Sequence, residues 1–225
     1  TGLSPNGTQI RPFKGRVPGF DLTFSAPKSV SVLYAFGDPL VRQQVTEAVD
    51  AAVQDSLSWL EREACFVRRG SNYKSTKTPA FEKWGTRRLP GRGFIAAQFR
   101  HRTSRLGDPQ LHSHVLVANL TQGPDGRWSA LDGQALYRSK MAAGAVYRSV
   151  LRHELSKRLG VEWGPVHKGL SEIAGIPSRV RRLYSKRRSE IETELARTGR
   201  TGSAAADVAS LDTRRSKLDT DPELL

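Results

Sequence analysis

Three histidines in one short stretch constrain the fold of this chain more than any other feature. His112 and His114 alternate in a run that predicts a β-strand, and side chains two residues apart on a strand share a face. His101 ends an apolar run that also predicts a strand. The polar residues between the two runs include Gly107 and an Asp-Pro pair, which favour a turn. The pattern therefore predicts a hairpin that brings three imidazoles together.

Imidazoles that converge from two paired strands form an open metal site, with positions left for substrate oxygens. We interpret His101, His112 and His114 as metal ligands. The simpler alternative is that each is an ordinary packed or surface histidine. The two remaining histidines, His153 in a predicted helix and His167 in a loop, are interpreted as structural or surface residues. Three imidazoles alone favour zinc, nickel or copper by affinity, so the ligand set leaves the identity of the ion open.

A second motif precedes the histidines. Residues 20–36 read FDLTFSAPKSVSVLYAF, and the histidine spacing downstream is H-x10-H-x-H. Together these motifs resemble the relaxase domain of conjugative relaxases of the TrwC/TraI type, which belong to the HUH endonuclease class. The resemblance covers residues from about 19 to about 160. It implies a metal-dependent enzyme that nicks one DNA strand at a plasmid transfer origin, forms a phosphotyrosine intermediate and later rejoins the ends.

The family's metal ligands carry over onto the three histidines, and the resemblance implies Mg²⁺ or Mn²⁺ as the cofactor. The family's buried aspartate, which hydrogen-bonds a ligand histidine, carries over onto Asp21. A carboxylate in that position fixes the tautomer and the orientation of the imidazole. Without the resemblance, Asp21 would be interpreted as an ordinary strand-end or turn aspartate. Ser113 departs from the wider class, which usually has a hydrophobic residue between the paired histidines.

The nucleophilic tyrosines of the family lie ahead of the stretch that matches Asp21, whereas the first tyrosine of this chain is Tyr34. We therefore expect a relaxase core that is incomplete at its N-terminus and a nucleophile that lies upstream of this chain. Nothing in the sequence places a tyrosine of this chain at the metal. The five tyrosines are Tyr34, Tyr73, Tyr137, Tyr147 and Tyr184.

The formal net charge of +14, from 36 basic and 22 acidic residues, favours a polyanionic partner. The alternatives are a merely soluble basic protein or a basic face toward a membrane. Residues 68–92 combine basic side chains with interleaved aromatics, which suits phosphates and stacked bases of single-stranded DNA. A solvated insertion is the alternative. Lys28, in the first turn of a helix predicted to start after an N-cap at Ser25, is a further phosphate candidate or a solvated lysine. The predicted DNA contacts are Lys28, Arg68, Arg69, Tyr73, Lys74, Lys77, Trp84, Arg87 and Arg88.

We expect an α/β (α+β) fold: a palm-like, mostly antiparallel sheet with helices packed on one face, plus a C-terminal helical appendage. Residues 1–176 are predicted to form the relaxase core. Residues 177–225 are predicted to form the appendage, or a linker toward a further domain. Helices are predicted over 40–64, 133–159 and 179–197, with a linker or loop over 198–210.

Several classes are disfavoured. The chain has no apolar stretch long enough to span a bilayer, and Cys65, its one cysteine, is expected to be a buried apolar residue in a bacterial cytoplasmic protein. No phosphate-binding loop supports ATP hydrolysis. The expected partners are single-stranded origin DNA, other relaxosome proteins, and a fused or separate helicase. The alternatives left open are a non-cleaving DNA-binding module with a metal site, a rolling-circle replication initiator, and a structural zinc protein.

Overall fold

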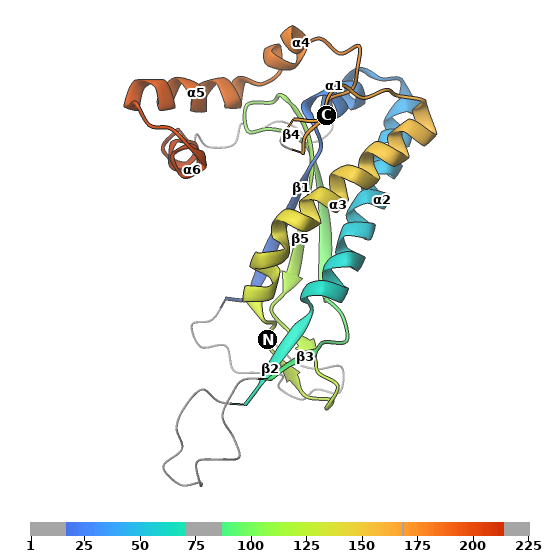
Figure 1. The fold of residues 1–225 in the computed structure, drawn as a ribbon. Helices are drawn as coiled ribbons and strands as arrows, with labels where there is room; N and C mark the ends of the chain where they lie inside the picture. Colours follow the sequence, from blue (N-terminus) through green and yellow to red (C-terminus); the bar gives the residue numbers. More distant parts are fainter. Residues whose placement is uncertain (1–16, 71–86, 168, 214–225) are drawn as a thin grey trace. The chain divides into compact units, whose positions relative to one another are not determined.

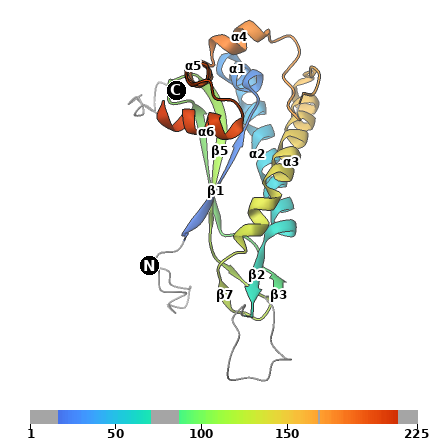
Figure 2. The ribbon, with the colours of Figure 1, turned by 60° about the vertical axis from the view of Figure 1, so that its left-hand side comes forward.

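The computed structural model describes residues 17–70, 87–167 and 169–213, drawn as ribbons in Figures 1 and 2. The chain forms two compact units. Among the described residues, one comprises 17–23, 54–70, 87–99 and 114–147, and the other comprises 24–53, 100–113, 148–167 and 169–213. Their boundaries fall within long strands and helices, so several elements contribute residues to both units. The predicted division at residue 177 stays a prediction.

The described residues form strands and helices in a mixed order, which confirms the expected α/β class. The strands are β1 (Gly19–Ser25), β2 (Phe66–Arg69), β3 (Arg87–Pro90), β4 (Ala96–Thr103), β5 (Pro109–Ala118), β6 (Thr121–Gln122) and β7 (Trp128–Ser129). The helices are α1 (Lys28–Phe36), α2 (Pro39–Ala64), α3 (Gly133–Leu159), α4 (Ser178–Leu183), α5 (Lys186–Thr198) and α6 (Ser203–Asp212).

The main sheet has the strand order β1-β5-β4. At one end the backbone N–H of Asn119 donates to Pro18, and at the other the N–H of Ala26 donates to Leu111. These two pairs lie in opposite chain directions, so β1 runs antiparallel to β5. Strands β4 and β5 are consecutive and joined by a tight turn in which Gly107 has a φ of 77°. The predicted hairpin is therefore confirmed.

Helix α2 covers one face of β4. The side chain of Gln98 hydrogen-bonds Gln54 of α2, and Arg100 forms an ion pair with Asp50 of α2. Since side chains alternate along a strand, the residues between and beside these two, Phe99 among them, point to the opposite face. That opposite face is the open face of the sheet, and it carries the histidines.

The core between sheet and helix follows the two expected periodicities. Val45, Val49 and Val53 recur every four residues along α2 and are fully buried, as an amphipathic helix requires. Val115 and Val117 alternate along β5 and are also buried. Ser113 continues that buried row of β5, so the residue between the two histidines points into the core. Cys65 is buried, as expected.

The C-terminal part differs from the prediction in two ways. The single helix expected over 179–197 is divided into α4 and α5 around Tyr184 and Ser185. The linker expected over 198–210 is wrong, because residues 203–212 form α6. Three consecutive alanines favour a helix there, and Arg187 of α5 donates hydrogen bonds to the carbonyl oxygens of Thr213 and Ser210. The helix is therefore held by a partner distant in sequence.

Candidate metal centre

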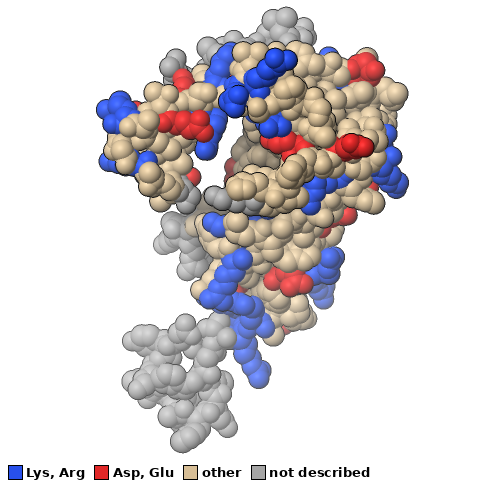
Figure 3. All heavy atoms as spheres, turned by 45° about the horizontal axis from the view of Figure 1, so that its top comes forward, with Lys and Arg blue, Asp and Glu red and all other residues tan. Residues whose placement is uncertain are grey.

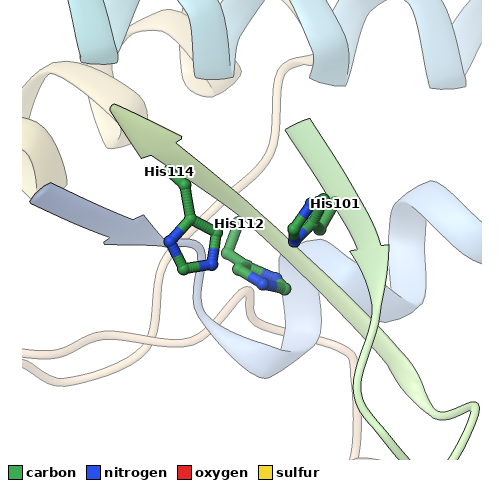
Figure 4. A group of neighbouring side chains, drawn as sticks. All are labelled: His101, His112 and His114. Carbon is green, nitrogen blue, oxygen red and sulfur yellow. The ribbon is translucent and has the colours of Figure 1, made fainter. Parts of the chain in front are cut away.

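Strands β4 and β5 bring the three histidines together on one side of the hairpin. Each of His101, His112 and His114 offers a ring nitrogen, and these nitrogens lie within 4.8 Å of one another. The rings of His101 and His112 lie 5.1 Å apart between centroids and meet edge to face. Figure 4 shows one ring coming from β4 and two from β5, on strands that run in opposite directions. All three predicted ligands therefore lie within reach of a single ion.

The hydrogen bonds of the rings suit a cation. Nδ1 of His112 lies 2.8 Å from the carbonyl oxygen of Gln110, and Nδ1 of His114 lies 2.8 Å from a carboxylate oxygen of Asp21. A carbonyl or an ionised carboxylate only accepts, so each Nδ1 carries the proton and each Nε2 keeps its lone pair for a metal. Nitrogens that share one ion lie about 3 Å apart, so small ring rotations close the cluster. The donor set fits a divalent metal ion.

Asp21 lies where the resemblance places it, but it is not buried. Both carboxylate oxygens lie within 2.9 Å of Nδ1 of His114, and the Asp21 side chain keeps 49% of its surface exposed. The exposure follows from its position on the open face of β1. Thr23, two residues further along β1, places its hydroxyl 3.3 Å from the same Nδ1. The sequence did not single out Thr23, although its two-residue spacing from Asp21 places both side chains on the same face of a strand.

The start of α1 is not open to a phosphate in the way the sequence suggested. The N-cap residue of α1 is Pro27, not the expected Ser25, and it makes no side-chain capping bond. The carboxylate of Glu172, distant in sequence, accepts the backbone N–H of Ser29 at 2.8 Å. Lys28 donates to the carbonyl oxygen of Pro109 at 2.7 Å, and burial lowers the pKa of Lys28. The predicted contact between Lys28 and DNA stays a prediction.

The serines of the SAPKSVS motif connect α1 to distant segments. The buried hydroxyl of Ser31 accepts the backbone N–H of Leu111, next to His112 on β5, at 3.0 Å. The buried hydroxyl of Ser29 accepts the N–H of Ile173 at 2.8 Å. The motif thus fixes the strand that carries two of the histidines, which gives a physical reason for the two sequence signals to occur together.

The turn of the histidine hairpin is also tied to the C-terminal helices. Asp108, which the sequence analysis used only as a turn signal, is buried. Its carboxylate accepts the backbone N–H of Lys186 at 2.7 Å and pairs with the ammonium group of Lys186 at 3.6 Å. Lys186 is the first residue of α5, so the carboxylate also lies where a helix favours negative charge.

Strands β2 and β3 form an antiparallel pair that aligns four of the predicted DNA-binding residues. Arg68 pairs with Arg88 and Arg69 pairs with Arg87, and we call these four residues the arginine ribbon. The two strands lie side by side in both ribbon views (Figures 1 and 2). The other predicted contacts in this segment, Tyr73, Lys74, Lys77 and Trp84, lie outside the described residues.

Two carboxylates hold three members of the ribbon. The side chain of Asp132 is fully buried, and its oxygens lie 2.7 Å from Arg88 and 3.6 Å from Arg68. Among the described residues neither oxygen of Asp132 receives a well-aligned hydrogen bond, so these are charge contacts.

The other carboxylate belongs to Asp125. Arg69 donates to both of its oxygens, at 2.8 and 2.9 Å, which holds the pKa of Asp125 well below its usual range. Arg87 is exposed.

The remaining basic side chains do not form one patch on the face drawn in Figure 3, where Lys and Arg are spread with acidic side chains between them. Net charge therefore does not locate a DNA site by itself. Within the described parts of the chain, no helix is both long enough and apolar enough to cross a membrane.

Three of the described tyrosines contact residues other than the histidines, and the fourth is buried in the core. The hydroxyl of Tyr34 accepts a hydrogen bond from Arg102 at 2.9 Å, and Tyr147 is buried in the core. The rings of Tyr137 and Tyr184 pack against other aromatic rings, those of Phe20 and Phe36 respectively. Tyr73 lies outside the described residues.

Comparisons with known proteins identify the family of this chain. A family model described as TrwC relaxase matches residues 1–224. The multifunctional conjugation protein TraI of Escherichia coli is 36% identical in an alignment 218 residues long, which covers 92% of this chain and 11% of TraI. This chain therefore spans about a ninth of the length of that relative.

Two solved structures share the fold. One is the conjugative relaxase TrwC in complex with oriT DNA in a metal-bound form, with a TM-score of 0.81 and 31% identity over 98% of this chain and 74% of that one. The other is TrwC with a 27-mer DNA comprising the recognition hairpin and the cleavage site, with a TM-score of 0.77 and 33% identity over 92% of this chain and 69% of that one. The match to nearly the whole chain, together with these relatives, shows that the chain belongs to the TrwC relaxase family.

Proposed function

We propose that this chain is the catalytic core of a relaxase that nicks one DNA strand at a plasmid transfer origin and later rejoins it. The observation that carries the proposal is the set of three convergent histidines on the open face of the sheet, with the Nδ1 of two of them anchored. Membership of the TrwC relaxase family supports it, as do relatives described in complex with oriT DNA and with a cleavage site.

In this proposal His101, His112 and His114 hold a divalent ion, and we favour Mg²⁺ or Mn²⁺ from the family resemblance. Such an ion supplies positive charge that offsets the charge building on the scissile phosphate. Asp21 and Thr23 fix the ring of His114, and the carbonyl oxygen of Gln110 fixes that of His112. These contacts keep each Nε2 unprotonated and correctly directed. The open face admits the DNA strand.

The nucleophile in this proposal is a tyrosine supplied from outside residues 1–225. Its oxygen attacks the phosphorus, the bond from phosphorus to the 3′ oxygen breaks, and the 5′ phosphate stays on the tyrosine while a 3′ hydroxyl is released. The positions of the described tyrosines support this assignment, since their contacts lie with Arg102, with other rings or in the core. They equally favour a second candidate, in which the isolated chain binds metal and single-stranded DNA but does not cleave.

We further propose that the chain works in the bacterial cytoplasm on single-stranded origin DNA, beside other relaxosome proteins and a helicase. The helicase is either fused to the same polypeptide or separate. The name of the relative TraI, a multifunctional conjugation protein of which this chain spans 11%, supports a larger assembly.

The test is cleavage of an end-labelled single-stranded origin oligonucleotide in Mn²⁺. Two forms are compared, this chain and a version that carries its native upstream sequence. We expect only the extended form to cleave and to leave a covalent protein–DNA band. In the extended form, His112→Ala or His114→Ala should abolish cleavage while leaving most DNA affinity. His153→Ala, on α3, is the matched control and should cleave normally.

Two results would overturn parts of this proposal. Unchanged cleavage by His112→Ala or His114→Ala would remove the metal assignment. Cleavage by this chain alone would show that one of its own tyrosines, or a water molecule, acts as the nucleophile.

A further inference from the structure

The open face of the sheet carries large apolar side chains as well as histidines. Ile95 and Phe99 are each 50% exposed, and Leu116 is 48% exposed. Scattered exposed apolar residues are common on protein surfaces, but an apolar group beside a polar site marks a surface for binding. The mechanism proposed above uses none of these three residues.

The register of the hairpin places the Phe99 ring beside a ligand. The backbone N–H of Ala118 donates to the carbonyl oxygen of Ile95 at 2.8 Å, so these two residues are paired. Counting four residues inward along each antiparallel strand brings Phe99 opposite His114. Two further residues bring His101 opposite His112, in agreement with the 5.1 Å between their rings.

The direction of the Phe99 ring follows from its neighbours. Gln98 bonds Gln54 and Arg100 pairs with Asp50, both on α2, so both side chains point to the covered face. Phe99 therefore points to the open face, as Leu116 does on β5, two residues beyond His114.

We propose that Phe99, with Leu116 diagonally across the hairpin on β5, is a platform on which a nucleobase of single-stranded DNA stacks when a phosphate of the same strand lies at the metal centre. The inference rests on the proposed function. Phe99 lies two residues from His101, or about 7 Å along the strand.

A nucleobase is the occupant that fits both parts of this face. Single-stranded DNA presents phosphates that require a cation and flat apolar bases that stack on aromatic rings, and stacking on phenylalanine does not depend on base identity. The net charge of +14 favours the same polyanion. An apolar protein segment would cover Phe99 equally well, but it would give no preference for DNA that carries bases.

The experiment separates bases from phosphates. Two fluorescently labelled probes are titrated in Mn²⁺ with the full chain by anisotropy: a 20-nucleotide oligothymidylate and a 20-unit abasic phosphodiester backbone. We expect wild type to prefer the oligothymidylate, and Phe99→Ala to lower that affinity by about tenfold while leaving the abasic affinity unchanged. Phe36→Ala, which removes a 63% exposed ring from α1, is the matched control and should change neither affinity.

A second variant guards against a simple loss of folding. Phe99→Trp keeps an aromatic surface, so it should retain the preference for the base-containing probe, and its emission should be quenched when that probe binds. Circular dichroism of each variant checks the fold.

The platform is overturned if wild type shows no preference between the probes. It is also overturned if Phe99→Ala weakens both equally, or if it behaves like Phe36→Ala. In those cases binding of both probes and histidine-dependent cleavage by the extended form leave the proposed function standing. If neither probe binds, the platform and the proposed function both fail.

Discussion

The metal centre consists of neutral, oriented ligands, whereas the arginine ribbon consists of permanently charged side chains. The histidines of β4 and β5 are neutral ligands whose direction is fixed, because acceptors at Gln110 and Asp21 hold Nδ1 of His112 and His114. The arginines of β2 and β3 are permanently charged, and carboxylates hold three of the four. A ligand must have the correct tautomer and direction, whereas a cation that follows phosphates needs only to be near the strand.

This contrast predicts which substitutions should affect function most. Removing an acceptor behind a histidine changes the chemistry of the ligand itself. Removing an arginine changes one charge among several, and its effect depends on how strongly that arginine is already bound within the protein. Each of these effects should be smaller than the complete loss of cleavage expected for His112→Ala or His114→Ala.

The largest of these effects is expected behind His114. Asp21→Ala should weaken binding of Mn²⁺ by about 10-fold to 100-fold, because the imidazole loses the carboxylate that fixes its tautomer and raises its basicity. Isothermal titration of the chain with Mn²⁺ measures this affinity. Thr23→Val, which removes the longer contact of 3.3 Å, is the comparison and should weaken binding less. Equal Mn²⁺ affinity for Asp21→Ala and wild type would contradict the role of Asp21.

A smaller effect is expected in the arginine ribbon, where Arg87 and Arg69 form a matched pair on opposite strands. Arg87→Ala should lower affinity for single-stranded DNA several-fold and reduce the slope of log K against log salt by about 0.7, the loss of one phosphate contact. Arg69→Ala should change both less, since its guanidinium group is already bonded to Asp125.

Anisotropy titrations over a series of NaCl concentrations give both quantities. A larger change for Arg69→Ala than for Arg87→Ala would show that the carboxylate partner does not withdraw an arginine from DNA.

The smallest effect concerns pH. Arg69 depresses the pKa of Asp125 in the folded state below its usual value of 3.8, so this pair stabilises the fold above that pH and the contribution is lost as pH falls further. The pair is at the surface, so the loss is small. Thermal melts of wild type and Asp125→Asn from pH 6 to pH 2 measure it. The gap in Tm, with wild type higher, should narrow as pH falls; a constant gap would contradict the assignment.

Much of the fold was predictable from local pattern. The predicted helix over 133–159 coincides with α3, and the one over 40–64 agrees with α2 to within a residue at its start, because each has apolar residues at helical spacing. Gly160 also marks the end of α3. The histidine hairpin was predictable because strand periodicity and turn residues specify which side chains share a face. Asp21 needed the resemblance, since a single carboxylate carries no periodic signal.

What the sequence alone determined about this protein is therefore its periodic elements, the convergence of the three histidines and its excess of positive charge. Only the tertiary structure decided the partners: Glu172 at the start of α1, Asp108 at the start of α5, and Asp132 beneath the arginine ribbon. Each of these contacts joins residues more than forty positions apart. Local propensity specifies which face a side chain occupies, whereas the choice of a distant partner depends on how the whole chain packs. The position of α6 also depends on this packing, because contacts with α5 stabilise it.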